Sequence, residues 1–267
     1  MRLVYLGTPA IAVPPLLALV DAGHEIVLVV TGADKRRGRG SATSPNPVKE
    51  TALSLGLPVT HHIDDVLAVE AELGVVVAYG RIIKPHVLDH LAMINLHFSL
   101  LPRWRGAAPV ERALLEGDAE TGVCVMAVEE GLDTGGVYAR AVVAVPDGAA
   151  ADDLRHLLVD VGTKLLVDTL ATGLGEAQAQ IGEPVYAAKI TPDELRIDWN
   201  APAEQIDRLL RLGGAWTTWR GARFKIHAAD LVDGILTPTI VQPEGKPRMA
   251  YLDWRNGAQP VADEWFV

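Results

Sequence analysis

The sequence predicts an α/β fold: a Rossmann-like, mostly parallel sheet flanked by helices, followed by a small C-terminal β-rich domain. Three observations support this prediction. The chain has 267 residues and is 49% hydrophobic, so it can bury a large core. In its first part, short runs rich in valine and isoleucine alternate with helical segments, as in parallel sheets. Towards the C-terminus the apolar runs become short and are separated by turns, which indicates a small barrel or sheet.

The chain opens with a strand, a helix and a second strand. Residues 3–6 form an apolar run that ends at Gly7, residues 13–22 have helical periodicity, and residues 25–30 form the next apolar run. The turn at Gly7 can offer main-chain N–H groups to an anion at the start of the helix. It lacks a full GxGxxG pattern, so a dinucleotide site is only weakly indicated.

The same alternation continues through most of the chain. We expect further strands at residues 58–59, 75–78, 94–97, 122–128 and 137–145, and helices at residues 47–55, 109–116, 152–170 and 203–210. The strand at residues 137–145 alternates loosely, which favours an antiparallel position at an edge of the sheet. We expect an N-terminal domain at residues 1–182, a linker at residues 183–203 and a small β-rich domain at residues 204–267.

Composition narrows the class of protein. The net charge of −10 argues against a general nucleic-acid binder, although it allows a local basic surface. The one cysteine, Cys124, lies in an apolar run, where core packing is expected and a disulfide framework is not. The start of the chain has the pattern of a strand rather than a signal peptide, and no apolar run approaches the length of a membrane span. We therefore expect a cytoplasmic protein.

Three polar side chains between residues 94 and 134 are candidate catalytic residues. Asn95 and His97 end an apolar run, and the period-two geometry of a strand would place both on one face. An amide and an imidazole that point the same way can donate hydrogen bonds to a carbonyl oxygen that becomes negative during attack. Asp133 lies in a turn after a strand, from which its carboxylate can keep His97 protonated or accept a proton. On residue types alone, surface or capping roles are the more common explanation.

Longer motifs in the same stretch resemble those of a known family. They read Asn-Leu-His at residues 95–97, Ser-Leu-Leu-Pro at 99–102, Arg-Trp-Arg-Gly-Ala-Ala-Pro at 103–109 and Gly-Leu-Asp-Thr-Gly at 131–135. In wording and order the chain closely resembles the folate-dependent formyltransferases, most of all the methionyl-tRNA formyltransferases, along most of its length. The resemblance implies the formyltransferase fold with a catalytic N-terminal domain, followed here by a shortened, OB-like barrel. It also implies that formyl transfer depends on Asn95, His97 and Asp133.

By this resemblance, the co-substrate is 10-formyltetrahydrofolate. Its pteridine ring would lie at the carboxyl end of a parallel strand, where ligands bind in open α/β sheets, against the main chain around Arg81, Ile82 and Ile83. A second segment would close the other side: Val128, Glu129, Glu130 and Leu132. Without the resemblance, the first segment would be taken as an ordinary strand-to-helix loop. No metal is expected, since no cluster with the spacing of metal ligands occurs in the sequence.

The acceptor of the formyl group is less clearly marked. By resemblance, the turn at Thr8 faces the acceptor, and Arg39 matches an arginine in a loop that contacts the acceptor end of tRNA. Arg36 and Arg37 belong to the same run of cations, which is either a clamp on phosphate or a solvated surface loop. We also expect acceptor contacts from Arg103 and Arg105, which flank Trp104; this tryptophan can either stack on a base or sugar or fill a gap. Two departures from the family weaken the tRNA hypothesis. Ser-Ala-Thr at residues 41–43 replaces the usual lysines, and the C-terminal domain is short.

We therefore expect transfer of a formyl group to a primary amine, with methionyl-tRNA ahead of the other acceptors. The alternative acceptor is a small amine, such as hydroxyornithine in siderophore assembly or an amino sugar, which the acidic charge and compact tail favour. Two other hypotheses are a non-catalytic folate- or nucleotide-binding protein and a hydrolase that releases formate. Ser99 and Cys124 have no base beside them in sequence, so an activated nucleophile is not indicated. The sequence does not indicate an oligomeric state.

Overall fold

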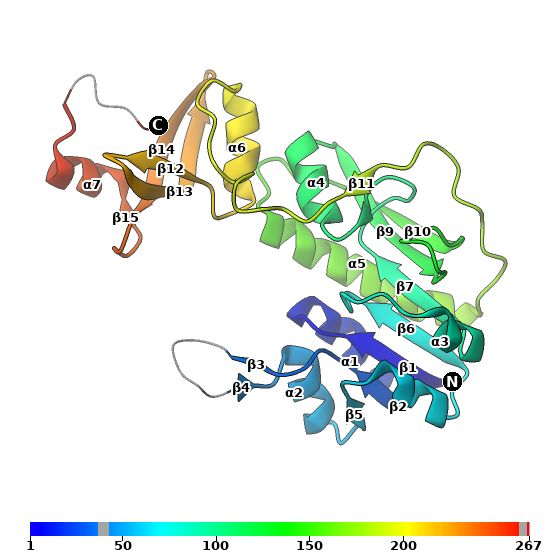
Figure 1. The fold of residues 1–267 in the computed structure, drawn as a ribbon. Coiled ribbons are helices and arrows are strands. Elements are labelled where there is room, and N and C mark those ends of the chain that lie inside the picture. The colour runs from blue at the N-terminus through cyan, green and yellow to red at the C-terminus, as the bar shows by residue number, and fades with distance from the viewer. Residues whose placement is uncertain (37–42, 262–265, 267) are drawn as a thin grey trace. The chain divides into compact units, whose positions relative to one another are not determined.

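The computed structural model describes residues 1–36, 43–261 and 266, and its largest feature within them is a seven-stranded mixed sheet (Figure 1). The strand order is β10-β9-β7-β6-β1-β2-β5. These strands are β1 (Arg2–Gly7), β2 (Glu25–Val30), β5 (Val59–Thr60), β6 (Leu73–Val77), β7 (Met93–His97), β9 (Glu120–Ala127) and β10 (Val137–Ala144). The five strands from β7 to β5 are parallel, whereas β9 and β10 are antiparallel to their neighbours. This topology confirms the predicted fold class and the antiparallel edge strand.

Helices lie between and after the strands of this sheet, as the alternation in the sequence predicts. They are α1 (Val13–Asp21), α2 (Pro47–Ser54), α3 (Pro85–His90), α4 (Pro109–Glu116) and α5 (Ala151–Thr172), with the 3₁₀ helices η1 (Ala10–Ala12) and η2 (Ile63–Ala68). The start of α2 has recognisable local causes, because Pro47 begins the helix and Asn46 Oδ1 accepts a hydrogen bond from Lys49 N at 3.0 Å. The sequence analysis does not predict α3, whose six residues are too few to show helical periodicity.

Apolar side chains cover both faces of the seven-stranded sheet. On one face, Val4 and Val76 belong to a hydrophobic cluster that includes Val87 of α3. On the opposite face, α5 approaches so closely that a Cβ added to Gly162 would lie 3.3 Å from the Leu96 side chain. The strands are therefore fixed between two packed layers, and β7 has its polar residues on the face away from α5.

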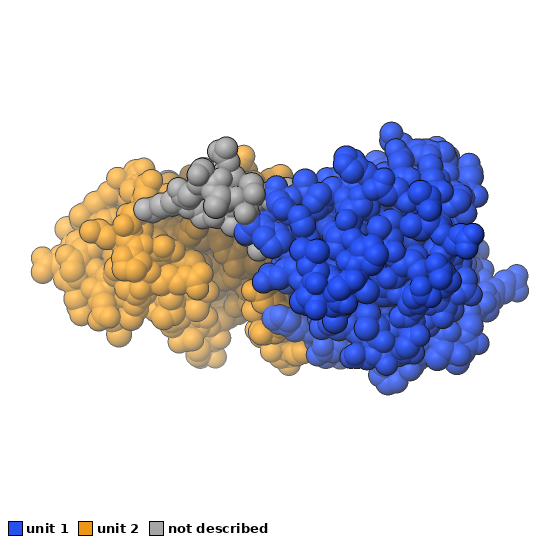
Figure 2. Space-filling model, turned by 90° about the horizontal axis from the view of Figure 1, so that it is seen from below, with its two compact units in different colours: residues 1–109, 120–144, 155–187 blue, residues 110–119, 145–154, 188–267 orange. Residues whose placement is uncertain are grey.

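The chain divides into two compact units, coloured blue and orange in Figure 2. The first contains the seven-stranded sheet and comprises Met1–Pro109, Glu120–Ala144 and Arg155–Ala187. The second comprises Val110–Ala119, Val145–Leu154 and Ala188–Val267. The domain boundaries at residues 182 and 203 stay predictions.

The second unit has an antiparallel sheet and a hydrophobic core of its own. Its four strands are β12 (Trp216–Trp219), β13 (Ala222–Val232), β14 (Ile235–Pro243) and β15 (Met249–Ala250), and they lie in the sheet in the same order as in the sequence. Its core includes Phe224 and Trp254, together with Leu210 from α6 (Ala203–Arg211). The sheet confirms the small β-rich domain; in the part of the chain that the structure describes, β12 and β15 are its two edges. Trp254 lies in α7 (Tyr251–Ala258), a helix that the sequence analysis does not predict.

Two short strand pairs complete the first unit. β3 (Lys35–Arg36) pairs antiparallel with β4 (Thr43–Ser44), and β8 (Arg105–Gly106) pairs in parallel with β11 (Tyr186–Ala187). Across residues 1–36 and 43–261, every helix is too short or too polar to cross a lipid bilayer.

Gly122 in β9 provides a test of the sheet edge. An added Cβ would lie 2.2 Å from the Ala141 carbonyl oxygen of β10 and 2.5 Å from the Leu100 side chain. We expect Gly122→Ala to lower the free energy of unfolding by about 1–3 kcal/mol, because the two strands must separate to admit a methyl group. Urea unfolding measures this change. Gly175→Ala is the matched control, since nothing lies within 4 Å of that position; equal stability of the two variants would contradict the strand pairing.

Candidate active site

His97 is the buried polar residue at the centre of the candidate site. It ends β7, and only 6% of its side chain is exposed. Its Nε2 lies 2.9 Å from the main-chain carbonyl oxygen of Trp104. Because a carbonyl oxygen can only accept a hydrogen bond, Nε2 carries a proton and donates it. The other ring nitrogen, Nδ1, faces the Asp133 carboxylate, with 3.7 Å between Nδ1 and Oδ2.

Asp133 is held next to His97 by the main chain of a distant turn. The amide N–H of Gly106 donates to Asp133 Oδ2 at 2.8 Å. Asp133 has a φ of +52°, in the left-handed region that residues other than glycine rarely adopt. The surrounding contacts must therefore stabilise this backbone conformation. The structure thus brings together two of the three predicted catalytic residues, which are distant in sequence.

The segment from Ser99 to Gly106 positions the histidine ring. Ser99 Oγ donates to the Arg103 carbonyl oxygen at 2.7 Å, and the Leu101–Pro102 peptide bond is cis. Trp104 has a φ of +65° and is buried, with the Arg103 guanidinium 4.4 Å from its ring centroid. Of the two hypotheses for Trp104, the structure supports the one in which it fills the interior. Its main-chain carbonyl fixes His97, a role that the sequence motif does not reveal.

Asn95 belongs to the same strand as His97. It is half-buried at the centre of β7, between the buried residues Ile94 and Leu96. Alternation along a strand puts Asn95 and His97 on the same face, opposite to Leu96 and α5. The amide therefore lies on the face of the sheet where His97 and Asp133 meet.

The loop after β9 follows the length of β7. At its start, Val128 N donates to the carbonyl oxygen of Met93, the first residue of β7. Five residues later, Asp133 lies beside His97, the last residue of the same strand. A five-residue strand is roughly 15 Å long, so this loop spans the candidate site from one end to the other.

The residues predicted to bind folate form two loops with shared apolar contacts. Val128 packs against a hydrophobic cluster that contains Ile83 and Tyr79. Ile82 and Leu132 are instead 85% and 59% exposed. The remaining three predicted residues are exposed: Arg81, Glu129 and Glu130. Burial raises the pKa of the Tyr79 hydroxyl, and the nearby charge of Arg81 opposes this shift.

The residues predicted to bind the acceptor differ in their contacts and exposure. Thr8 Oγ1 accepts from Gly32 N at 3.2 Å and donates to the Tyr79 carbonyl oxygen at 3.5 Å, so it joins the ends of β1, β2 and β6. Arg36 lies in β3, and Arg37 and Arg39 lie outside the described residues. Arg103 is exposed, whereas the Arg105 guanidinium donates from Nε and Nη2 to Gln180 Oε1 at 3.0 and 2.6 Å.

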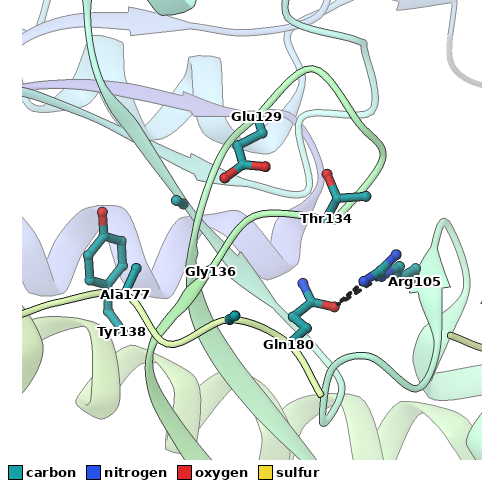
Figure 3. A pocket seen from close by; sticks show the side chains of 9 residues that line it. Arg105, Glu129, Thr134, Gly136, Tyr138, Ala177 and Gln180 are labelled. Atoms are coloured by element: carbon teal, nitrogen blue, oxygen red, sulfur yellow. Dashed lines mark hydrogen bonds between the residues drawn. The ribbon is translucent and has the colours of Figure 1, made fainter. Parts of the chain in front are cut away.

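A pocket of about 550 Å³ lies beside the Asp133 loop (Figure 3). Its polar lining includes Arg105, Glu129, Thr134, Tyr138 and Gln180. Sequence reasoning overlooks Gln180, because it lies in a turn-rich segment with no periodicity and outside every motif. Its contacts to Arg105 and to the Asp133 loop become visible only in three dimensions.

Cys124 and Ser99 are not arranged as activated nucleophiles. Cys124 is completely buried, and burial raises the pKa of its thiol, so it is not poised as a nucleophile. Ser99 uses its hydroxyl to hold the turn described above. In residues 1–36, 43–261 and 266, no group of three or more His, Cys, Asp or Glu side chains is arranged to hold a metal ion. That the reaction needs no metal stays a prediction.

Comparisons with known proteins identify the family of this chain. The family described as Formyl transferase matches residues 1–170, and the Formyl transferase, C-terminal domain matches residues 189–235. A methionyl-tRNA formyltransferase from Roseobacter denitrificans is 44% identical to this chain, with 97% of this chain and 96% of the relative covered.

Two solved structures share the fold. HypX from Aquifex aeolicus, in complex with tetrahydrofolic acid, superposes with a TM-score of 0.68 at 14% identity, covering 96% of this chain and 47% of HypX. An N-formyltransferase from Helicobacter canadensis, in complex with folinic acid and dTDP-3-aminofucose, superposes with a TM-score of 0.65 at 16% identity, covering 94% of this chain and 98% of that chain. The family matches, the full-length relative and the shared fold together show that this chain belongs to the formyltransferase family.

Proposed function

We propose that this enzyme transfers a formyl group from 10-formyltetrahydrofolate to the amino group of methionyl-tRNA. The observation that carries the chemistry is the pairing of a buried His97, held at Nε2 by a carbonyl oxygen, with Asp133 at 3.7 Å from Nδ1. The relative from Roseobacter denitrificans, which carries the name of this activity, aligns with nearly the whole chain. A cytoplasmic location remains part of the same prediction.

The exposed apolar side chains fit the proposed folate co-substrate. Ile82 and Leu132 come from the two loops next to β7 and expose most of their surface. A flat, aromatic pteridine ring would cover such side chains, and this binding is favourable because it removes their apolar surface from water. The main-chain groups of both loops can satisfy the polar edge of the ring. HypX, which shares the fold, contains tetrahydrofolic acid, and this supports the same class of ligand here.

In the proposed mechanism, three side chains act on one carbonyl group. The acceptor amine forms a bond to the formyl carbon, and negative charge develops on the formyl oxygen. The Asn95 amide and His97 Nδ1–H donate hydrogen bonds to that oxygen. The imidazole uses Nδ1 because its Nε2–H already donates to the Trp104 carbonyl oxygen. Asp133 accepts the proton that the amine loses. The bond from the formyl carbon to N10 then breaks, and the proton passes to N10.

The C-terminal unit offers support for a tRNA acceptor. On its sheet, the Trp216 ring has the Arg196 guanidinium 5.7 Å and the Arg223 guanidinium 4.3 Å from its centroid. Trp219 has the Arg220 guanidinium at 4.1 Å. Aromatic rings with arginines beside them suit the bases and phosphates of an RNA strand.

A small amine is the second candidate acceptor. Residues 41–43, Ser-Ala-Thr, lack the lysines expected for tRNA contact, and the net charge of the chain is −10. The Helicobacter canadensis enzyme, which has the same fold, was solved with a nucleotide-linked amino sugar. These features favour an amino sugar or hydroxyornithine only if the loop around residues 37–42, which lies outside the described residues, does not bind RNA.

Substitution of the catalytic residues tests the chemistry. We expect Asn95→Ala, His97→Ala and Asp133→Ala each to lower the rate of formyl transfer about a hundredfold or more, because each removes a group that interacts with the transition state. Release of tetrahydrofolate measures the rate, and circular dichroism checks that each variant is folded. His90→Ala, at an exposed position in α3, is the matched control. Near-normal turnover of any of the three variants would remove that residue from the mechanism.

Salt dependence distinguishes the two acceptors. With methionyl-tRNA, kcat/KM should fall steeply as salt rises from about 50 to about 200 mM, because phosphate contacts release counterions. With hydroxyornithine or an amino sugar, it should change little. Turnover of a small amine with no detectable turnover of methionyl-tRNA would contradict the tRNA proposal, and release of formate without any acceptor would indicate a hydrolase.

The protonation of His97 is a third test. Long-range ¹H–¹⁵N correlation spectra of the folded protein at neutral pH should show a proton bound to Nε2, since its partner is a carbonyl oxygen. His97→Ala identifies the signal by its loss. A spectrum in which Nε2 of His97 lacks a proton would contradict the assigned role of Nδ1.

A further inference from the structure

We propose that Gln180 is a positioning residue for formyl transfer: its side-chain amide fixes the Asp133 turn and thereby holds the Asp133 carboxylate beside His97. This inference rests on the proposed function and extends it to a residue outside every recognised motif. Gln180 precedes β11 in the chain and lies between Arg105 and the Asp133 loop (Figure 3).

The Gln180 amide donates two hydrogen bonds to the turn. Its Nε2 lies 2.8 Å from the Asp133 carbonyl oxygen and 2.8 Å from the Gly135 carbonyl oxygen. Its Oε1 accepts both hydrogen bonds from Arg105. Carbonyl oxygens only accept and a guanidinium only donates, so the orientation of the amide is fixed by its partners. One side chain therefore uses both ends to connect three segments of the first unit.

Hydrogen bonds hold both the main chain and the side chain of Asp133. Gln180 holds its main-chain carbonyl, and Gly106 N holds its carboxylate at 2.8 Å. Arg105, the residue before Gly106, is bound to Gln180 through its guanidinium and to Val185 O through its main-chain N–H at 2.9 Å. A shift of Gln180 would thus affect both the turn that carries Asp133 and the strand that carries its hydrogen-bond donor.

The turn needs such support because its backbone conformation is unfavourable. Asp133 has a φ of +52°, which an L-residue keeps only when its surroundings enforce it. Gln180 itself is well anchored, since Gln178 and Val137 exchange two main-chain hydrogen bonds of 2.8 Å just before it. The restraint therefore runs from a fixed segment, through one amide, to the turn that positions the carboxylate.

Two substitutions of Gln180 separate the two halves of its amide. Gln180→Ala removes every contact, and we expect kcat with methionyl-tRNA to fall roughly ten- to a hundredfold, as is typical when a reacting group is misplaced by about 1 Å. The KM for 10-formyltetrahydrofolate should change much less, because the side chain contacts the Asp133 turn rather than the exposed apolar residues. Gln180→Glu keeps an oxygen for Arg105 but cannot donate to the two carbonyl oxygens, so it should lose activity as well.

Gln178→Ala is the matched control, because Gln178 lies two residues before Gln180 and its side chain is exposed. This substitution keeps the main-chain hydrogen bonds between Gln178 and Val137. A double-mutant cycle with Asp133→Ala then shows whether Gln180 acts through Asp133. Under single-turnover conditions, Gln180→Ala should lower the rate less than about twofold in the Asp133→Ala background, because the residues act as a unit. A purely structural role would give the same fold-loss in both backgrounds.

The outcomes separate this inference from the proposed function. If the unsubstituted enzyme transfers no formyl group to methionyl-tRNA or to the small amines, the proposed function fails. If it is active and Gln180→Ala keeps its kcat, the positioning role is overturned. Full activity of Gln180→Glu, or equal losses in the two backgrounds of the cycle, would overturn it too.

Discussion

A buried histidine with one ring nitrogen held by the main chain is the constraint on which the rest of the site depends. The Trp104 carbonyl oxygen accepts a hydrogen bond from His97 Nε2–H, so only Nδ1 remains to face a reacting group. That nitrogen faces Asp133, whose carboxylate is held by a main-chain N–H of the same turn that supplies the carbonyl. Burial strengthens these interactions, because little water competes with them.

The fold provides this arrangement through strand β7 and the loop that follows its length. β7 is fixed between parallel β6 and antiparallel β9, and α5 packs on one of its faces. The other face is left for Asn95 and His97. Because the loop after β9 starts at one end of β7 and reaches His97 at the other, it carries Asp133 to the imidazole and exposes Leu132 on the way. A small set of packed elements thus positions both the side chains proposed for catalysis and the apolar surface proposed for folate.

The elements that could be predicted from the sequence are those determined by nearby residues. The start of α2 and the strand at Glu25–Val30 follow from capping residues and apolar runs, and both could be predicted. Asn95 and His97 on one face follow from strand periodicity. Helices α3 and α7 could not be predicted: α3 has only six residues, and both helices are held by packing rather than by a pattern of their own.

The candidate site divides in the same way. The motifs identify Asn95, His97 and Asp133, but the partners that position them are main-chain groups of Trp104 and Gly106, which no side-chain pattern encodes. Gln180 is distant in sequence from every motif, and folding brings its side chain into contact with Asp133. Long-range contacts of this kind depend on topology, so residue types alone do not predict them.

The central claim is that Asn95, His97 and Asp133 converge around one formyl group. A crystal structure of the enzyme with a stable 10-formyl analogue of tetrahydrofolate tests it most directly. We predict a pteridine ring between Ile82 and Leu132, with the formyl oxygen within hydrogen-bond distance of the Asn95 amide and of His97 Nδ1. A ligand bound elsewhere, or a formyl group that none of the three side chains contacts, would contradict the account.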